Sequence, residues 1–160
     1  MSEHPPIQGY ELIRLLGRNG HLVYLARHST TGQLAFLNFV HSSHEFGKMV
    51  AEKLRQQAKA LEILDHPNIV RLIELRDAQD YGFFSAIEFV DGESLAEVVR
   101  RGHLPPPREV VRIARSVATA LNYVHGKSIV YGRVRPEHIL LDRTGHVFLT
   151  GFGEFVPINP

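Results

Sequence analysis

The stretch IVYGRVRPEHILLD, residues 129–142, decides the fold of this chain together with the tripeptide GFG at residues 151–153. Apolar residues at 139–141 and 147–149 flank the turn-forming tetrapeptide DRTG. Two short apolar runs around such a turn predict a β-hairpin. We therefore expect a hairpin directly after the polar stretch YGRVRPEH.

Two helices are predicted upstream of this stretch. Ser94-Leu95-Ala96-Glu97 is a capping box, in which Ser94 accepts from a free backbone N–H and Glu97 reaches back to the cap. The short helix that follows is expected to end at Gly102. A longer helix is predicted after three prolines, because apolar residues recur there at helical spacing: Val110, Ile113, Ala114, Val117, Leu121 and Val124.

The first half of the chain is predicted to be rich in strands. Residues 8–40 alternate apolar and polar positions between glycines, which predicts three strands. Residues 45–64 have helical spacing, and residues 69–74 and 83–90 predict two more strands. The expected fold class is α+β, with two lobes: five strands with one inserted helix, then helices and a hairpin.

Composition limits the function further. The chain has 160 residues, a net charge of +1 and no cysteine. Scattered Lys and Arg argue against a nucleic-acid or anionic-membrane surface, which needs a basic patch. Without cysteine there is no disulfide framework and no thiolate zinc site. No run approaches the roughly 18 apolar residues that span a bilayer. We expect a cytoplasmic protein with no membrane and no nucleic-acid partner.

The order of these elements and four motifs resemble the eukaryotic-like Ser/Thr protein kinases, from about Tyr10 to Gly153. HPNIVRL at 66–72 is similar to the entry into the fourth strand of the small lobe, and EFVDGESL at 88–95 to the hinge. Residues 129–142 look like the catalytic loop, and GFG stands where the family has Asp-Phe-Gly.

The resemblance implies one kinase-like domain over residues 1–160, with a protein-kinase fold. Residues 8–90 would form a small lobe, a five-stranded antiparallel sheet with one helix. Residues 91–160 would form the first part of a mainly helical large lobe, ending just after Gly-Phe-Gly.

The resemblance also shows which family residues are replaced in the small lobe. The glycine-rich loop would begin at Gly17, with Asn19 at its second glycine. Asn38 stands at the position of the third-strand lysine. Counted back from His66, Gln57 stands at the position of the helix glutamate, and Glu52 and Glu62 lie five residues to either side.

In the large lobe Arg133 stands at the catalytic aspartate, and a guanidinium cannot accept a proton. His138 replaces the magnesium-binding asparagine and Gly151 the magnesium-binding aspartate. Magnesium prefers hard oxygen ligands, and none remains at these positions. The resemblance and the replacements together predict an inactive pseudokinase with a scaffold or regulatory role, with no catalytic residue, metal or cofactor.

Apolar residues of the family are kept in two hydrophobic columns. The resemblance places Leu61, Leu72, Tyr131 and Phe152 in one column, and Val23, Phe36 and Leu140 in the other. Phe36 replaces the small alanine that packs on the adenine base. We hypothesise that Phe36 fills this pocket; the alternative is that Phe36 turns away and leaves it open.

Two other functions stay open. Arg18, Arg133 and Arg135 could converge on the former phosphate site, which would make an ATP- or anion-binding regulatory domain without phosphotransfer. An active kinase with displaced catalytic groups is the third possibility.

The partner is expected to be a protein or a second copy of the chain. The sequence stops soon after Gly-Phe-Gly, which would leave the Val110 to Val124 helix face bare. Either the chain is a fragment of a longer protein, or it is a natural half-domain that a partner covers.

Overall fold

The computed structural model describes residues 7–18, 21–40, 45–78, 82–152 and 156–157. The chain divides into two compact units, residues 1–59 with 71–89 and residues 60–70 with 90–160. Asn19 and Gly153 lie outside the described residues, and so does the side chain of Arg18.

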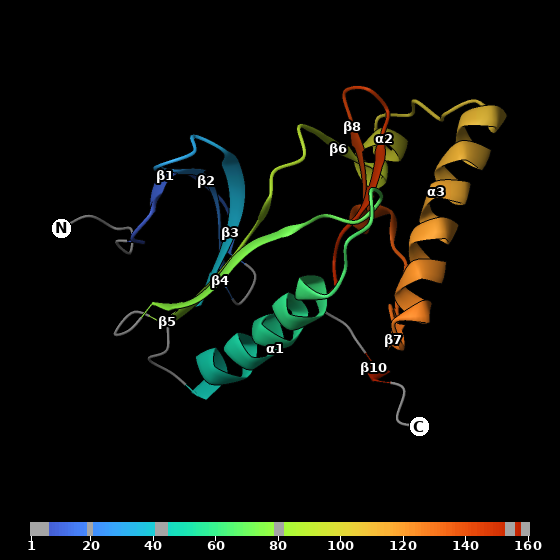
Figure 1. Cartoon of the computed structure of the whole chain (residues 1–160). Coiled ribbons are helices and arrows are strands. Elements are labelled where there is room, and N and C mark those ends of the chain that lie inside the picture. Colours follow the sequence, from blue (N-terminus) through green and yellow to red (C-terminus); the bar gives the residue numbers. More distant parts are fainter. Residues whose placement is uncertain (1–6, 19–20, 41–44, 79–81, 153–155, 158–160) are drawn as a thin grey trace. The chain divides into compact units, whose positions relative to one another are not determined.

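The first unit is a five-stranded antiparallel sheet with one helix (Figure 1), as predicted. The strands lie in the order β1-β2-β3-β5-β4. Their bounds are β1 Tyr10–Arg18, β2 Leu22–His28, β3 Leu34–Val40, β4 Leu72–Ala78 and β5 Gly82–Glu88, and the helix α1 is Glu45–Glu62.

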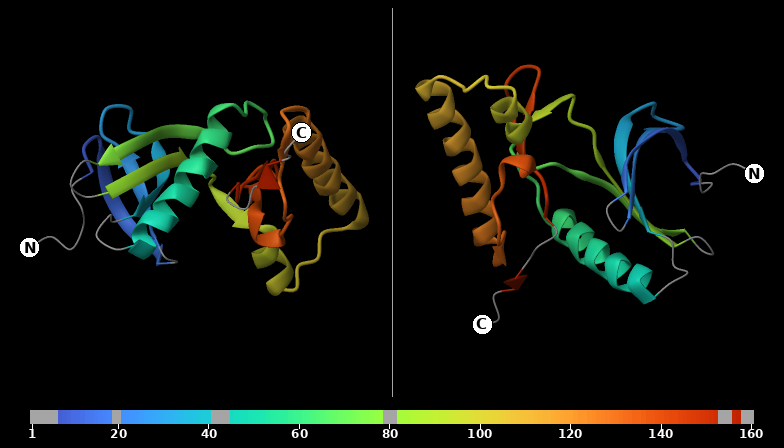
Figure 2. Two further views of the ribbon diagram at one scale, coloured as in Figure 1. Left: turned by 90° about the horizontal axis from the view of Figure 1, so that it is seen from below. Right: turned by 180° about the vertical axis from the view of Figure 1, so that it is seen from behind.

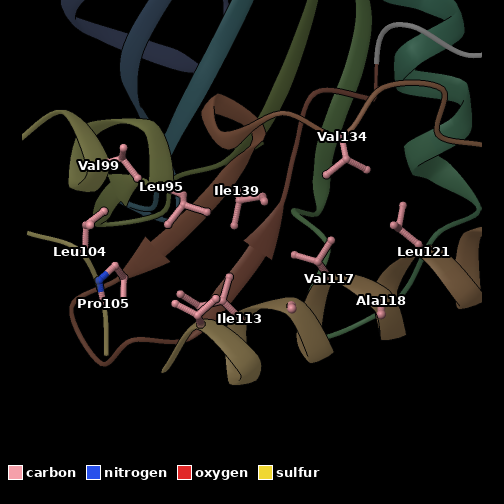
Figure 3. Close-up of a pocket in the computed structure, with 12 residues that line it drawn as sticks. Leu95, Val99, Leu104, Pro105, Ile113, Val117, Ala118, Leu121, Val134 and Ile139 are labelled. Atoms are coloured by element: carbon pink, nitrogen blue, oxygen red, sulfur yellow. The ribbon is translucent and has the colours of Figure 1, made fainter. Parts of the chain in front are cut away.

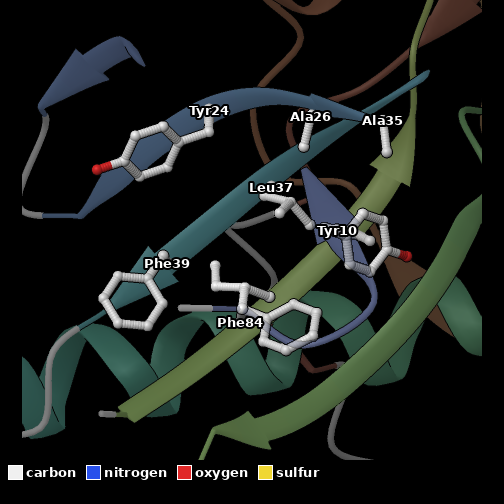
Figure 4. Close-up of a cluster of buried hydrophobic side chains, with 9 residues drawn as sticks. Tyr10, Tyr24, Ala26, Ala35, Leu37, Phe39 and Phe84 are labelled. Carbon is white, nitrogen blue, oxygen red and sulfur yellow. The ribbon is translucent and has the colours of Figure 1, made fainter. Parts of the chain in front are cut away.

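Alternation along β3 gives the sheet two different faces. Ala35, Leu37 and Phe39 are buried in a core with residues from β2, β5 and β1, among them Tyr24, Phe84 and Tyr10 (Figure 4). On the opposite face, Val40 and Phe83 pack with Ala51 and Leu54 of α1. Because successive side chains of a strand point to opposite faces, Phe36 and Asn38 share the α1 side of the sheet with Val40.

The second unit combines two helices with short strands. Helix α2 is Leu95–Arg100, α3 is Pro107–Gly126, and a three-stranded sheet orders β6 (Gly92–Ser94), β8 (Ile139–Asp142) and β9 (Val147–Leu149) as β6-β8-β9. Strand β7 (Ile129–Val130) pairs with β10 (Val156–Pro157), and Pro136–His138 form a 3₁₀ turn. Figure 2 shows α3 alongside this strand-rich part, into which Ile113, Val117, Ala120 and Val124 are buried.

The predicted local signals of the second unit are present. The Ser94 hydroxyl accepts from the Glu97 N–H at 3.2 Å, and the Glu97 carboxylate accepts from the Ser94 N–H at 2.7 Å. The Ser94 N–H and the Ser94 hydroxyl, the latter at 2.9 Å, both donate to the Glu97 carboxylate and lower the pKa of Glu97. Asp142 organises the hairpin turn, because its carboxylate accepts from the N–H groups of Thr144 and His146, both at 2.8 Å.

The segment before β4 differs from the prediction, because the strand begins at Leu72 rather than at residue 69. Asn68 instead bonds to β9: its side-chain amide donates to the Val147 carbonyl at 2.8 Å, and its carbonyl accepts from Leu149 N–H at 2.8 Å. Hydrogen bonds to β9 thus tie residues 66–70 into the second unit, although the expected lobe division puts them with the first.

Candidate functional site

Asn38, which the resemblance assigned to the position of the family's lysine, lies in the middle of the sheet. It is paired with Val23 on β2 and with Ser85 on β5. The Asn38 amide donates to the buried Ser85 hydroxyl at 3.5 Å, the long limit of a hydrogen bond. Position 38 therefore carries a neutral, weakly bonded side chain.

Gln57 lies on the half-buried side of α1, between the buried residues Leu54 and Ala58. Glu52 and Glu62 are both exposed. Five residues turn a helix by about 140° relative to a whole number of turns, so neither glutamate can share the side of Gln57. Neither Glu52 nor Glu62 therefore places its carboxylate on the side of α1 that Gln57 occupies.

The Phe36 ring packs against Phe89, with ring centroids 5.1 Å apart and planes at 59°. Both residues belong to the first unit. Whether Phe36 fills the adenine pocket stays a prediction. Gly17 faces Val23 in the β1–β2 ladder, and a Cβ built on Gly17 would meet no atom within 4 Å.

Tyr131 anchors the loop that contains Arg133. Tyr131 is 2% exposed, and its hydroxyl donates to the Thr150 carbonyl. Gly132 has a left-handed backbone with φ +77°, and the Arg133 N–H donates back to the Tyr131 carbonyl at 2.9 Å. The turn leaves the side chains of Arg133 and Arg135 exposed.

His138 and Gly151, which the sequence analysis assigned to the family's magnesium-binding positions, are in direct contact. A Cβ built on Gly151 would lie 2.5 Å from both Cγ and Nδ1 of His138, closer than real Cβ atoms approach. Gly151 also has φ +77°, where side chains are strained. The imidazole of His138 thus occupies the space that a side chain at position 151 would need.

The surroundings hold His138 in this place. Its carbonyl accepts from the Thr150 N–H at 2.9 Å, and the Tyr131 ring meets it edge-on at 6.4 Å. Among the described residues, the buried Nδ1 of His138 has no hydrogen-bond partner. The contact between His138 and Gly151 is therefore one of packing.

Two residues that the resemblance assigned to the first hydrophobic column are in contact in the second unit. Tyr131 and Phe152 are both buried, with ring centroids 5.1 Å apart and planes at 84°. Leu61 is buried, and Leu72, Val23 and Leu140 are half-buried. The columns as a whole draw on both units and stay a prediction.

Over the described ranges, no three His, Cys, Asp or Glu side chains gather where they could hold a metal ion. Within the same ranges, no helix has the length and apolar character needed to cross a membrane.

A second feature is an apolar groove of about 620 Å³ in the second unit (Figure 3). Its lining comes from α2, α3, two loops and the first residue of β8: Leu95, Val99, Leu104, Pro105, Val110, Ile113, Ala114, Val117, Ala118, Leu121, Val134 and Ile139. The predicted bare helix face supplies five of its residues at this groove. The expectation of a bare face is wrong for Ile113, Val117 and Val124, which are 4%, 7% and 0% exposed.

Sequence reasoning missed two relations of this site. It treated His138 and Gly151 as separate losses, although a glycine and a bulky residue 13 positions before it both stand in the sequence. It also missed that Val134 and Leu104 complete the groove, because neither belongs to a periodic pattern.

The protein kinase domain family matches residues 10–158 of the chain. The chain is 27% identical to the serine/threonine-protein kinase PrkC of Bacillus subtilis, over 90% of this chain and 22% of that protein. It is 31% identical to protein kinase 3 of Dictyostelium discoideum, over 92% and 16%. It is 30% identical to cAMP-dependent protein kinase type 3 of Saccharomyces cerevisiae, over 94% and 38%. The chain thus spans well under half the length of these relatives.

Proposed function

The chain belongs to the protein kinase domain family, and on this premise we propose that it is a cytoplasmic pseudokinase that binds a protein partner and transfers no phosphate. One observation carries the proposal: His138 is packed against Gly151, so the imidazole fills the place of a metal ligand. A magnesium ion would need hard oxygen ligands at this place. Gly151 has no side chain and the side chain of His138 is an imidazole, so neither side chain supplies an oxygen ligand.

Arg133, the residue assigned to the position of the general base, supports the same proposal. Arg133 is exposed and permanently cationic, so it cannot take a proton from a substrate hydroxyl. Removing one electrostatic group from a catalytic site typically costs about 3 kcal/mol of transition-state stabilisation. Such losses do not add up, but losing the base and both metal ligands together leaves no group to position the reaction.

The sheet contributes a third line of support. Asn38 is neutral and bonded to Ser85, so it supplies no charge for a phosphate. Gln57 is also neutral and supplies no counter-ion for a lysine at position 38.

The test combines a transfer assay with thermal unfolding. The full chain is incubated with γ-labelled ATP, Mg²⁺ or Mn²⁺, and a mixture of protein substrates, and we expect no labelled protein. Unfolding is then followed with ATP alone and with ATP and Mg²⁺, and we expect no shift. A ligand at about 100 times its Kd would add about 2.7 kcal/mol, which is readily detected.

Each other outcome identifies a different function. Stabilisation by ATP without magnesium favours the ATP- or anion-binding regulatory domain. Stabilisation that needs magnesium, or label that disappears in Arg133→Ala or Asn38→Ala, would overturn the proposal in favour of an active kinase.

The variant Phe36→Ala tests whether Phe36 closes the nucleotide pocket. If it does, removal of the ring should allow ATP alone to raise the unfolding temperature. Leu25→Ala is the matched control, because Leu25 is the cross-strand neighbour of Phe36 on β2. If ATP raises the unfolding temperature of neither variant, the hypothesis that Phe36 fills the pocket is wrong. That result would leave the proposed absence of phosphate transfer unaffected.

A further inference from the structure

The segment of residues 66–70, between α1 and β4, is held on β9 by hydrogen bonds. Two of them join backbone groups: the Leu149 N–H donates to the Asn68 carbonyl at 2.8 Å, and the Val70 N–H donates to the Leu149 carbonyl at 3.1 Å. The Asn68 side chain adds a third, to the Val147 carbonyl at 2.8 Å. Asn68 takes part in two of these three bonds, so the attachment depends on how its backbone is oriented.

The ring of His66 fixes the backbone at Asn68. The Asn68 N–H donates to Nδ1 of His66 at 3.0 Å. A ring nitrogen that accepts a hydrogen bond carries no proton, so His66 is the neutral tautomer with its proton on Nε2. The bond closes a turn of the kind that Asn and Asp side chains form with the N–H two residues later. A proton on Nδ1 would place a donor opposite the Asn68 N–H and break the turn.

Helix α3 holds the His66 ring in this position. The ring lies against that of Tyr123, with centroids 5.1 Å apart and planes at 35°. The Tyr123 hydroxyl also accepts from the Asp65 N–H at 3.1 Å. His66 is half-buried, and burial lowers its pKa below the ordinary value of 6.5. The folded chain thus favours the neutral ring that the turn requires.

Three further ionisable side chains belong to the surroundings of this turn. Lys127 of α3 lies over the aromatic ring that contacts His66, 5.5 Å from its centroid, and Asp65 precedes His66 in the chain. His146, in the turn between β8 and β9, has its Nε2 2.8 Å from the Pro67 carbonyl, which makes this nitrogen the donor. Protonation of His146 keeps that donor, whereas protonation of His66 removes an acceptor. The two histidines therefore respond to acid in opposite ways.

We propose that His66 is a pH-dependent switch, which holds residues 66–70 on β9 when it is neutral and releases them when it is protonated. The segment leads from α1 to β4, so its release frees the stretch of the second unit that connects two elements of the first. A histidine whose folded pKa is lowered stabilises the fold above its unfolded pKa, and this contribution is lost as the pH falls through the folded pKa. Release is therefore expected in mildly acidic solution, below pH 6.5.

Nitrogen NMR and hydrogen exchange on the full chain test the switch. At neutral pH the imidazole spectrum of His66 should show Nδ1 without a proton and Nε2 with one. The protection factors of the Leu149 and Val70 amides should then fall about tenfold in mildly acidic solution, since one net hydrogen bond is worth about that factor. Amides of β2 and β3 should keep their protection, which separates local release from global unfolding.

Two substitutions at position 66 separate titration from packing. His66→Asn keeps an acceptor bonded to Cγ, as Nδ1 is, but does not titrate, so the Leu149 amide should stay protected at both pH values. His66→Phe keeps a ring beside Tyr123 but has no acceptor, so protection should be low at both. His103→Asn is the control, because His103 is exposed in the loop between α2 and α3. It should respond to acid as the native chain does.

Three results would overturn the switch. The first is a proton on Nδ1 of His66 at neutral pH, because that nitrogen could not then accept from Asn68. The second is a loss of protection in acid that persists in His66→Asn; if His146→Gln abolishes it instead, His146 is the titrating group. The third is native-like protection in His66→Phe, which would show that the acceptor does not hold the segment. Phosphate transfer is measured separately, and neither of its outcomes bears on this switch.

Discussion

The sheet and the loop region both contain positions at which we predict that family residues are replaced, and the side chains at these positions are packed in physically different ways. On β3, Asn38 is half-buried and makes one long hydrogen bond to Ser85, so its replacement disturbs few contacts. At the loop, His138 and Gly151 fit only as a pair, because the ring takes the space of a side chain at 151. The single substitution Asn38→Lys can place a positive charge in the sheet. At the loop, a side chain at position 151 fits only if His138 is replaced at the same time.

The strongest way to break this comparison is Gly151→Asp, which restores the family's residue at one loop position. The new Cβ clashes with the His138 ring at a backbone of φ +77°, so we expect a loss of about 3 kcal/mol in the free energy of unfolding. Urea denaturation measures it. Gly32→Asp is the control, because Gly32 has φ +70° and no atom near its Cβ. Equal losses at both glycines would show that His138 plays no part.

The double variant His138→Asn with Gly151→Asp should recover about 2 kcal/mol of that loss, since the smaller amide vacates the space. The measurement is a double-mutant cycle of unfolding free energies over the four proteins. Additive effects would mean that the two positions are independent, contrary to their contact in the structure.

At the sheet position, Asn38→Lys is expected to change the unfolding free energy by less than about 1 kcal/mol. The hydrogen bond lost is long, and a lysine can extend its ammonium group toward water. Ser85→Ala serves as the comparison, because it removes the same bond from the buried partner. A loss as large as that of Gly151→Asp would erase the contrast between the two regions.

The smallest effect is expected in the hairpin turn that follows His138. The Thr144 hydroxyl donates to the Asp142 carboxylate at 2.7 Å, and this bond is the main cause that lowers the pKa of Asp142 below its usual 3.8; the N–H groups of His146 and Thr144 lower it further. A lowered carboxyl pKa stabilises the folded state above the unfolded pKa, and this contribution is lost as pH falls through the folded pKa. Thr144→Ala should therefore be less stable than the native chain at neutral pH, and the difference should vanish in acid.

The matched control for the turn is Thr119→Ala, because the Thr119 hydroxyl donates to a backbone carbonyl and not to a carboxylate. Its difference from the native chain should not depend on pH. Urea denaturation over a pH series decides between the two, and parallel curves for both variants would contradict the role of Asp142.

Local signals predicted most of the fold. The capping box at Ser94, the turn at Asp142 and the spacing of α3 all act within a few residues, so the sequence displays them directly. The bounds of β4 could not be predicted in this way. Residues 66–70 form hydrogen bonds with β9, about 80 positions later in the chain. Because these residues are bonded to β9, strand β4 begins only at Leu72.

Motif order assigns Asn38, Arg133, His138 and Gly151 to positions of the family pattern, and this assignment stays a prediction. The contacts that these residues make could not be read from the sequence. That His138 meets Gly151, and that Asn38 meets Ser85, depends on hairpin geometry and strand register. Pattern reasoning therefore assigned the positions but did not find which side chains lie against them.

The sequence by itself determined the family, the order of the elements and the types of side chain at each motif, since composition and short-range spacing carry that information. Only the tertiary structure decided that a histidine fills the space beside Gly151, that Val124 is buried while Val110 is half exposed, and that α2, α3 and Val134 enclose one groove. These are contacts between segments distant in the chain, and burial and steric exclusion exist only once the chain has brought those segments together.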